Sequence, residues 1–350
     1  MPPIHILNCV KVCENKLKSQ NDVILSVENL HVEFNLDEGI LRALNGMDIR
    51  LSRGKSIGIV GESGCGKTVT GHSILRILPP TADIVDGRIL LQTRDGNEVD
   101  LARLNPEGRE MRIIRGGDIS IIFQEPMAAF SPVHTISNQI TEAILLHEAL
   151  TPKQARQKVV DLLNLVGIPN PIQRLNEYPF QLSGGMCQRA MIAMALACNP
   201  RILIADEPTT ALDVTIQTQV MRLIKEMQAK SDLSLILITH DLGVVAHMVE
   251  HIYVTYLGRV VEDGPIRDVL RNPKHPYTAE LLKSIPKLSS SRKHNRIYPI
   301  TGTVPSPMDM PSGCAFHPRC PSVLGEICKT ETPGITRVNS EHGVHCFLYK

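Results

Sequence analysis

Residues 61–68 read Gly61-Glu62-Ser63-Gly64-Cys65-Gly66-Lys67-Thr68, and Val69 follows them. The segment fits the pattern G-x-x-x-x-G-K-[S/T], in which glycines let backbone N–H groups turn toward a phosphate group. The apolar run at 56–60 predicts a buried strand, and the stretch after the glycines predicts a helix from 67 to about 78, stopped by Pro79 and Pro80. The segment therefore predicts a phosphate-binding loop, in which Lys67 contacts the β- and γ-phosphates and Thr68 binds Mg²⁺. A chance glycine-rich turn is the alternative, and the flanking strand and helix argue against it.

Apolar runs of the parallel-strand type recur along the chain between helical stretches. We expect strands at 118–123, 201–205 and 233–238, and a helix that begins after Thr151-Pro152 and ends at Gly167. This alternation, from about residue 23 to 261, predicts a parallel sheet covered by helices. Prolines become frequent beyond about Pro265, so we place a domain boundary there and expect a loop-rich region after it.

Two carboxylates follow one of the predicted strands directly. Asp206 and Glu207 come after the apolar run at 202–205, and ligands bind at the carboxyl ends of strands in open parallel sheets. We expect Asp206 to hold Mg²⁺ and Glu207 to orient or deprotonate the attacking water. An Asp-Glu pair alone is more often a solvated strand end. The phosphate-binding loop upstream makes the functional interpretation the better one.

The composition excludes some classes of protein. Lys and Arg number 37 against 36 Asp and Glu, so the formal net charge of +1 gives no electrostatic attraction to nucleic acid. Six Phe, six Tyr and no Trp leave few rings for base stacking or for membrane-interface belts. The most apolar run, at 190–198, is far shorter than the about 20 residues that cross a bilayer. We therefore expect no nucleic-acid partner, no membrane span and a cytosolic location.

A second glycine-rich segment reads Leu182-Ser183-Gly184-Gly185-Met186-Cys187-Gln188-Arg189, and Ser183 is placed to cap the helix that follows. This octapeptide resembles the signature motif of the ATP-binding cassette (ABC) ATPases. The family's other motifs occur in order: Gln124 after the strand at 119–123, a D-loop-like Thr210-Ala211-Leu212-Asp213, and His240 after the strand at 235–239. Phe34 lies about where the family places an aromatic ring on adenine, with Phe in place of the commoner Tyr. The resemblance covers about residues 23–265.

The resemblance implies a fold and a site. The implied fold is an α/β P-loop NTPase (RecA-like) domain with a helical signature subdomain and a small antiparallel β subdomain. ATP is implied to lie in a head-to-tail dimer, with Ser183 and Gly185 on the γ-phosphate held by the partner's loop. The implied catalytic residues are Glu207, His240, Gln124 and Lys67, and the implied Mg²⁺ ligands are Thr68, Gln124 and Asp206. The implied ATP-binding residues are Phe34, Gly61, Glu62, Ser63, Gly64, Cys65, Gly66, Lys67, Thr68, Val69, Ser183, Gly184, Gly185 and Asp213.

The C-terminal region narrows the resemblance to one subfamily. His275-Pro276-Tyr277 and Gly313-Cys314-Ala315-Phe316-His317-Pro318-Arg319-Cys320-Pro321 resemble segments of the ATPase subunits of dipeptide and oligopeptide ABC importers. In some such subunits four cysteines bind a [4Fe-4S] cluster, and the spacing of Cys314, Cys320, Cys328 and Cys346 matches theirs. From the residues alone, four thiols in a cytosolic chain suit an iron–sulfur cluster, zinc or no metal, with His317, His342 and His345 as substitute or outer ligands. Cys187 and Cys198 are interpreted as packing residues, and Cys9 and Cys13 receive no role.

The sequence as a whole predicts an N-terminal tail at 1–22, an ABC ATPase domain at 23–265 and a loop-rich extension at 266–350. The resemblance implies an ATP-hydrolysing subunit of an importer for peptides or related small solutes, at the cytoplasmic face of the cell (inner) membrane. Its implied partners are a second ATPase subunit, as a paralogue in a heterodimer, two membrane permease subunits and an extracytoplasmic solute-binding protein. Because the nucleotide motifs all precede residue 265, we expect ATP turnover not to depend on the cysteines.

Two other classes of ABC protein compete with this prediction. ATPases that act on nucleic acid or in translation carry long coiled coils or two cassettes, whereas this chain has one cassette and no heptad stretch between Gly61 and Ser183. A cassette that only binds partners would not need intact Lys67, Glu207 and His240. The sequence does not identify the solute, since relatives of peptide importers also carry oligosaccharides or nickel.

Overall fold

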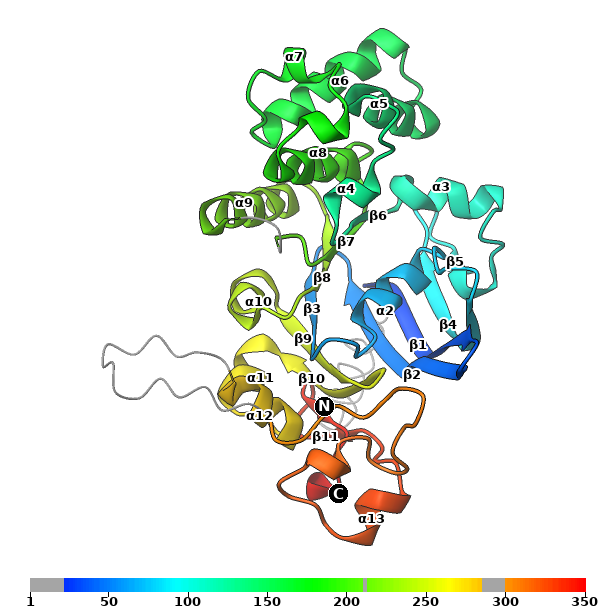
Figure 1. Ribbon diagram of the computed structural model, residues 1–350, viewed down its shortest axis with the longest axis vertical. Coiled ribbons are helices and arrows are strands. Elements are labelled where there is room, and N and C mark those ends of the chain that lie inside the picture. Colours follow the sequence, from blue (N-terminus) through cyan, green and yellow to red (C-terminus); the bar gives the residue numbers. More distant parts are fainter. Residues whose placement is uncertain (1–21, 210–212, 285–299) are drawn as a thin grey trace, which may run out of the picture.

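The computed structural model describes residues 22–209, 213–284 and 300–350 (Figure 1). Its centre is an eight-stranded sheet in the order β11-β12-β10-β9-β3-β8-β7-β6. Strands β9, β3, β8, β7 and β6 run parallel to one another, and β10, β12 and β11 add an antiparallel edge. The strand bounds are β3 Ser56–Val60, β6 Ile119–Ile122, β7 Ile202–Asp206, β8 Ser234–Ile238, β9 His251–Tyr256, β10 Arg259–Pro265, β11 Thr336–Arg337 and β12 Gly343–Val344.

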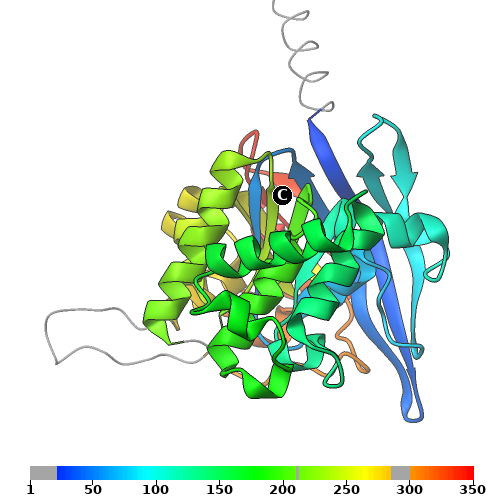
Figure 2. The same ribbon diagram turned by 90° about the horizontal axis from the view of Figure 1, so that it is seen from above.

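A second sheet of four strands lies beside the first and has the order β2-β1-β4-β5. Its strands are antiparallel and comprise β1 Val23–Leu36, β2 Gly39–Ser52, β4 Ala82–Gln92 and β5 Glu98–Asp100. Viewed from above, this sheet lies on one side of the central sheet and most of the helices lie on the other (Figure 2). The predicted α/β architecture, with its small antiparallel β subdomain, is confirmed.

Helices cover the remaining faces. The predicted helical subdomain is the group α5–α8 at one end of the molecule, and α9, α10, α11 and α12 line one side of the central sheet (Figure 1). The helix bounds are α2 Lys67–Ile74, α3 Arg109–Gly117, α4 Pro126–Ala129, α5 Ile136–His147, α6 Pro152–Leu165, α7 Pro171–Arg174, α8 Gly184–Leu196, α9 Val214–Lys230, α10 Leu242–Met248, α11 Ile266–Arg271, α12 Pro276–Lys283 and α13 Glu326–Thr330. No helix in the described part of the chain combines the length and the apolar character needed to span a membrane.

The core explains why the parallel strands read as unbroken apolar runs. Every residue of β3, β7 and β8 is buried, because the helical layer covers one face of these strands and α2 with the second sheet covers the other. Gly71 lets α2 pack this closely, since an added Cβ would lie 3.2 Å from Ile204 and 3.3 Å from Ile238. The phosphate-loop helix is thereby fixed against the sheet.

Two predicted helix ends can be compared with the structure. The helix after Thr151-Pro152 has the expected cap and ends before Gly167, which has a φ of 74°. Helix α2 ends at Ile74, earlier than predicted and before the prolines. Arg76 adopts a φ of 54°, and the N–H groups of Arg76 and Ile77 bond back to Ser73 O and His72 O. This left-handed turn closes α2, and the prolines are not needed to stop it.

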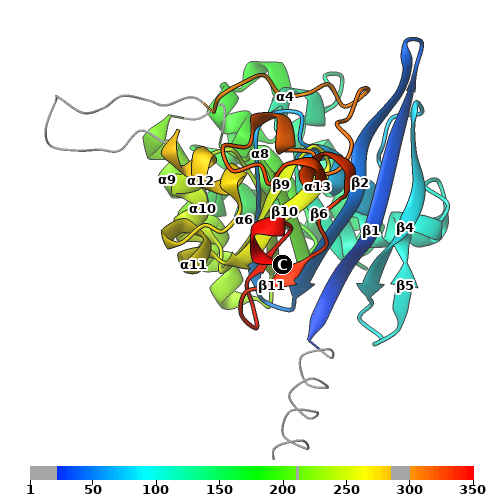
Figure 3. The same cartoon turned by 90° about the horizontal axis from the view of Figure 1, so that it is seen from below.

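The C-terminal extension packs against the part of the chain that precedes it. Strand β12 pairs with β10, so the chain returns to the central sheet at its end. Viewed from below, residues 300–350 of the extension lie beside β10, next to α11 and α12 (Figure 3). Buried Tyr277 and Phe316 join the same apolar core as the helical layer.

Candidate functional site

The phosphate-binding loop connects β3 to α2. Gly66 precedes α2 with a φ of 92°, a left-handed conformation that disfavours residues with a Cβ atom. An added Cβ at this position would also lie 2.7 Å from Ala43 O. The buried Lys67 ammonium donates to Gly61 O at 2.9 Å and to Glu62 O at 3.0 Å. The loop therefore presents a helix N-terminus and a lysine at one place, as an anion site requires.

This loop forms one wall of a cavity of about 550 Å³. Phe34, at the edge of β1, lies on the same cavity as Gln124 and Glu207, so motifs far apart in sequence converge there. Four lining residues were not predicted, and three of them are apolar residues of β1 and β2 that carry no motif. The fourth, Pro307, comes from the C-terminal extension. The full lining is Phe34, Leu36, Leu41, Ala43, Ser63, Gly64, Gly66, Lys67, Thr68, Val69, Gln124, Glu207 and Pro307.

Asp206 lies behind the loop at the end of β7 and is only 2% exposed. Its pKa is raised to about 6, chiefly by burial and also by the Glu207 charge, against the lowering effect of a hydrogen bond from Thr68 and of the Lys67 charge. Its Oδ1 atom is buried and has no hydrogen-bond partner among the described residues. A buried carboxylate oxygen without a partner, close to a threonine hydroxyl, fits the oxygen ligation that Mg²⁺ prefers.

Glu207 connects two of the other predicted residues. Its Oε1 atom lies 2.9 Å from His240 Nδ1, and its Oε2 atom accepts from Gln124 Nε2 at 3.4 Å. The Glu207 backbone has a φ of 45° and donates to Ile238 O at 2.8 Å, so the carboxylate is held in an uncommon conformation. The structure thus brings a carboxylate, an imidazole and an amide to the cavity edge.

The predicted signature residues lie apart from this cavity. Ser183 caps α8 as predicted, because its hydroxyl accepts from Met186 N at 3.3 Å. Asp213 caps α9 in the same way, through Ile216 N at 2.9 Å. Ser183, Gly184, Gly185 and Asp213 are absent from the part of the cavity lining that the structure describes. The first three residues of the D-loop-like segment, 210–212, lie outside the described residues, as do Cys9 and Cys13.

Three residues of the loop itself also face away from the cavity lining as described. The Cys65 thiol is buried, 3.0 Å from Thr255 Oγ1. The Glu62 carboxylate points to the extension and pairs with Arg319. Gly61 leaves no room for a side chain, because an added Cβ would collide with Thr255 O.

The four C-terminal cysteines come together at one small cavity. Cys314, Cys320, Cys328 and Cys346 all line it, with Phe316 and Phe347 among its apolar walls. The pKa of Cys314 is raised to about 11, chiefly by burial and to a lesser degree by the other three cysteines, while a backbone hydrogen bond from Phe316 lowers it. The prediction of a metal site is nevertheless not confirmed, because the described residues include no group of three or more His, Cys, Asp or Glu side chains that could hold a metal ion.

The three histidines proposed as substitute ligands have other partners. His342 Nε2 lies 2.7 Å from the buried carboxylate of Glu262. His345 Nδ1 lies 3.3 Å from Pro333 O. Of these three histidines, His317 lines the cysteine cavity, as does His275, and the Nδ1 atom of His317 lies 3.0 Å from Cys314 O.

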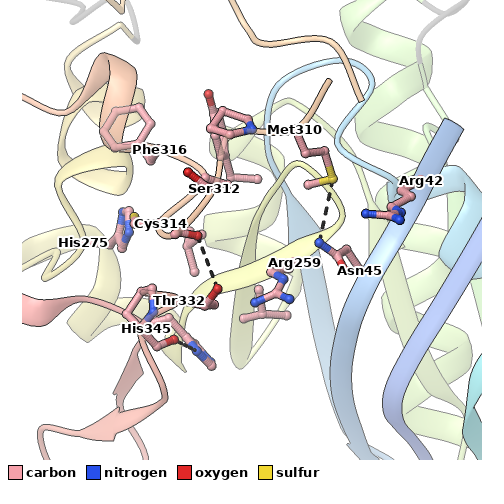
Figure 4. Close-up of a pocket in the computed structure, with 17 residues that line it drawn as sticks. Arg42, Asn45, Arg259, His275, Met310, Ser312, Cys314, Phe316, Thr332 and His345 are labelled. Carbon is pink, nitrogen blue, oxygen red and sulfur yellow. Dashed lines mark hydrogen bonds between the residues drawn. The ribbon is translucent and has the colours of Figure 1, made fainter. Parts of the chain in front are cut away.

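A second hollow, of about 250 Å³, separates the extension from the strands that it covers. Figure 4 shows Met310, Phe316 and His345 of the extension facing Arg42 and Asn45 of β2 across this space. Asn45 Nδ2 donates to Met310 Sδ at 3.7 Å, which is the direct contact across it that joins these segments. The extension therefore contacts the β subdomain through Met310 and Asn45, and beside this contact the hollow separates the two.

Comparison with known proteins agrees with this geometry. Residues 44–210 match the family described as ABC transporter, and residues 261–328 match the oligopeptide/dipeptide transporter C-terminal region. The dipeptide transport ATP-binding protein DppD of Bacillus subtilis is 49% identical over 326 residues, which are 93% of this chain and 94% of that protein. The chain belongs to the ABC transporter ATP-binding proteins. The oligopeptide transport ATP-binding protein AppD of the same organism is 44% identical over 93% of this chain and 97% of that protein.

Solved structures of ABC cassettes share the fold. The dimeric cassette MJ0796 in a post-hydrolysis state with ADP and Pi matches with a TM-score of 0.62 and 25% identity, over 69% of this chain and 99% of that one. CbiO1 of Clostridium perfringens, part of the cbiONQ transporter complex, matches with a TM-score of 0.57 and 28% identity, over 72% of this chain and 92% of that one. The prediction of an ABC-type P-loop fold is confirmed. As an ABC ATPase, the cassette implies ATP and Mg²⁺ as its ligands.

Proposed function

We propose that this chain is the ATP-hydrolysing subunit of an ABC importer for peptides or related small solutes. The observation that carries the ATPase is the cavity that joins Phe34, Lys67, Gln124 and Glu207. The importer class is supported by relatives named as dipeptide and oligopeptide transport proteins, which match almost the whole chain, extension included. We keep the division into 1–22, 23–265 and 266–350 as part of this proposal.

The proposed hydrolysis assigns one role to each residue at the cavity. Lys67 and the N–H groups of the loop bind the phosphates, while Thr68 and Asp206 hold Mg²⁺, with Gln124 at its edge. Glu207 accepts a proton from the attacking water, and its contact with His240 orients it toward the γ-phosphate. Phe34 stacks on the adenine ring. The metal, when bound, neutralises charge on the β- and γ-phosphates.

The signature motif completes the site from a second subunit in this proposal. Ser183 caps α8 on the surface, so the hydroxyl and the helix N-terminus of α8 are available to an anion outside the subunit. Gly184 leaves open space around it, since an added Cβ would have no described atom within 4 Å. Ser183 and Gly185 then contact the γ-phosphate of ATP on the partner's loop, and Asp213 lies at the same interface. We infer a paralogous partner and hence a heterodimer.

The remaining partners are proposed on the same basis. Two permease subunits would span the membrane, and an extracytoplasmic binding protein would deliver the solute to them. The helical subdomain and the segment before it expose large apolar side chains that such permeases could cover, among them Val133, Leu146, Ile172 and Phe180. The chain would then be peripheral at the cytoplasmic face of the cell membrane. Nucleic acid is not a partner in this proposal.

We further infer that the four cysteines hold a [4Fe-4S] cluster. The support is that Cys314, Cys320, Cys328 and Cys346 face one cavity with apolar walls. Two of the sulfur atoms already accept backbone N–H groups, Cys320 Sγ from Ser322 and Cys328 Sγ from Leu324, each at 3.4 Å. Such hydrogen bonds to the sulfurs are one of the means by which proteins tune these clusters. When bound, the cluster would cross-link a region with little secondary structure.

The cluster is tested by metal analysis of protein purified without oxygen. We expect about four irons and about four sulfides per chain, the content of one cubane. A finding of one zinc per chain would mean that the cysteines form a zinc site and not a cluster. No metal, together with an unchanged melting temperature in Cys320→Ser, would exclude both.

The importer function is tested by uptake of labelled dipeptides and oligopeptides into cells that carry either the wild-type chain or Glu207→Gln. We expect uptake in cells with the wild-type chain and none in cells with Glu207→Gln. We also expect the purified wild-type chain to hydrolyse ATP only when Mg²⁺ is present. Unchanged uptake with an inactive ATPase would exclude the importer role and leave an interaction protein. ATP turnover that responds to nucleic acid or ribosomes, with no effect on uptake, would favour the non-transport class.

A further inference from the structure

The C-terminal extension reaches the phosphate-binding loop through one ion pair. Arg319 Nη1 donates to Glu62 Oε2 at 2.7 Å, and Arg319 Nη2 donates to Glu62 Oε1 at 3.1 Å. The Arg319 side chain is 4% exposed and that of Glu62 is 24% exposed. Two parallel N–H···O bonds of this kind fix both the position and the angle of a carboxylate. Glu62 is therefore held by a residue that lies 257 positions later in the chain.

The backbone of Glu62 is held from the same side. Its N–H group donates to the hydroxyl of Tyr277 at 2.9 Å, and Tyr277 is fully buried. Its carbonyl accepts from the Lys67 ammonium at 3.0 Å. A displacement of Glu62 would thus move one of the two carbonyls that position the lysine.

Arg319 lies within the cysteine module, which we define as residues 313–320, and its backbone N–H group donates to Phe316 O of the same module at 3.0 Å. Its guanidinium also donates to Tyr256 Oη at 3.3 Å and to Thr301 O at 3.2 Å. Phe316 packs edge-on against Tyr256, with ring centroids 5.3 Å apart. Cys320 follows Arg319 directly and its N–H group donates to His317 O at 3.3 Å, so the position of this cysteine is tied to that of the Arg319 backbone in one turn.

We propose that Arg319 is a positioning residue for nucleotide binding, which neutralises Glu62 and holds the phosphate-binding loop, so that the cysteine module controls the affinity for nucleotide. This inference rests on the proposed ATPase function. It changes the expectation from the sequence that ATP turnover would not depend on the cysteines. The reason is the set of contacts at Glu62, which no motif of the sequence indicates.

The physical argument concerns an uncompensated charge. Without Arg319, the Glu62 carboxylate would lie next to a loop that binds the most negatively charged part of ATP. Unit like charges about 12 Å apart repel by an amount that corresponds to roughly a 10-fold loss of affinity at an effective dielectric constant near 20. If charge is the cause, removal of the carboxylate as well should restore binding.

The test measures the dissociation constant of Mg²⁺-ADP, which is not hydrolysed, by calorimetry on the full-length chain. We expect Arg319→Met to weaken binding about 10-fold and the double variant Arg319→Met/Glu62→Gln to recover to within about 3-fold of wild type. Arg319→Lys should fall between them, because a lysine keeps the charge and loses the two parallel bonds. A merely structural role of Arg319 predicts no recovery in the double variant, and that result would overturn the proposal.

Arg337→Met is the matched control. Arg337 also lies in the extension and pairs with a buried carboxylate, Asp263, at 2.9 Å, but this pair has no contact with the loop. We expect its ADP affinity to equal that of wild type, with the folded state of every variant checked by thermal melting. Equal weakening in Arg337→Met and Arg319→Met would overturn the proposal.

Cys320→Ser tests the link to the cysteine module. We expect weaker ADP binding than wild type and recovery when Glu62→Gln is added. If Cys320→Ser binds ADP with wild-type affinity, the proposal that the cysteine module controls nucleotide affinity is overturned. Should Cys320→Ser not fold, Phe316→Leu perturbs the same segment more mildly and has the same two outcomes. A failure of the proposed ATPase function gives a different result from a failure of this inference. If the function is wrong, wild type and Lys67→Ala will have the same affinity for Mg²⁺-ADP.

Discussion

Asp206 is expected to destabilise the nucleotide-free fold, and Asp206→Asn should therefore stabilise it at neutral pH. The carboxyl is buried, and burial raises its pKa from 3.8 to about 6. The unfolded chain releases this proton at a lower pH than the folded protein does, so the free energy of unfolding falls as the pH rises from about 4 to about 6. Above about pH 6 the unfolding free energy falls no further. The total loss is about 3 kcal/mol, the free energy that corresponds to this shift in the pKa of Asp206.

The assay is urea unfolding of wild type and Asp206→Asn at several pH values, without nucleotide and with a chelator. About 2 kcal/mol of the effect falls between pH 4.5 and pH 7.5, so the difference in unfolding free energy between the two proteins should grow by about that much. A buried Asn amide nitrogen without a partner in place of Oδ1 adds a constant cost of about 1–3 kcal/mol and no pH dependence. The trend with pH is therefore the quantity that tests the reasoning.

Asp161→Asn is the control, since Asp161 lies exposed on α6 and its carboxylate faces water in both states. We expect no growth of its difference from wild type over the same pH range. The reasoning is refuted if the difference in unfolding free energy between wild type and Asp206→Asn does not change with pH. Burial of the Asp206 carboxylate would then not lower the stability of the fold.

Three further outcomes are expected. Glu207→Gln should still bind ATP and lower turnover by about 10²–10⁴-fold, so that an ATP-bound dimer accumulates in size-exclusion chromatography; near-normal turnover would mean that Glu207 is not the base. Lys67→Ala should weaken ATP binding by the isolated subunit, whereas Ser183→Arg should leave binding intact and block turnover; equal loss of affinity in both would contradict a shared interface. Phe316→Ala should lower the unfolding free energy by about 3–5 kcal/mol, because the ring is 1% exposed, and a loss below 1 kcal/mol would show that it does not pack as described.

Local patterns of the sequence determined the fold class and most of the nucleotide site. The nucleotide site is built largely from one continuous segment, which comprises a strand, the phosphate-binding loop and a helix. Each of these elements is predicted by the residue types within it. Ser183 and Asp213 likewise cap the helices that follow them, as short-range hydrogen bonds require. Strands buried on both faces, such as β7 and β8, are continuous apolar runs in any sequence.

Contacts between distant segments were decided only by the tertiary structure. Strands β11 and β12 have two residues each, too few for any periodicity, and they form because β10 offers a free edge. Pro307 reaches the nucleotide cavity, and Arg319 reaches Glu62, across more than half of the chain. Proline and arginine have many uses in a loop-rich region, so neither residue type carries information about its partner. A partner of this kind is fixed by how the extension packs on the central sheet, because side chains at such sequence separation meet only once the core has formed.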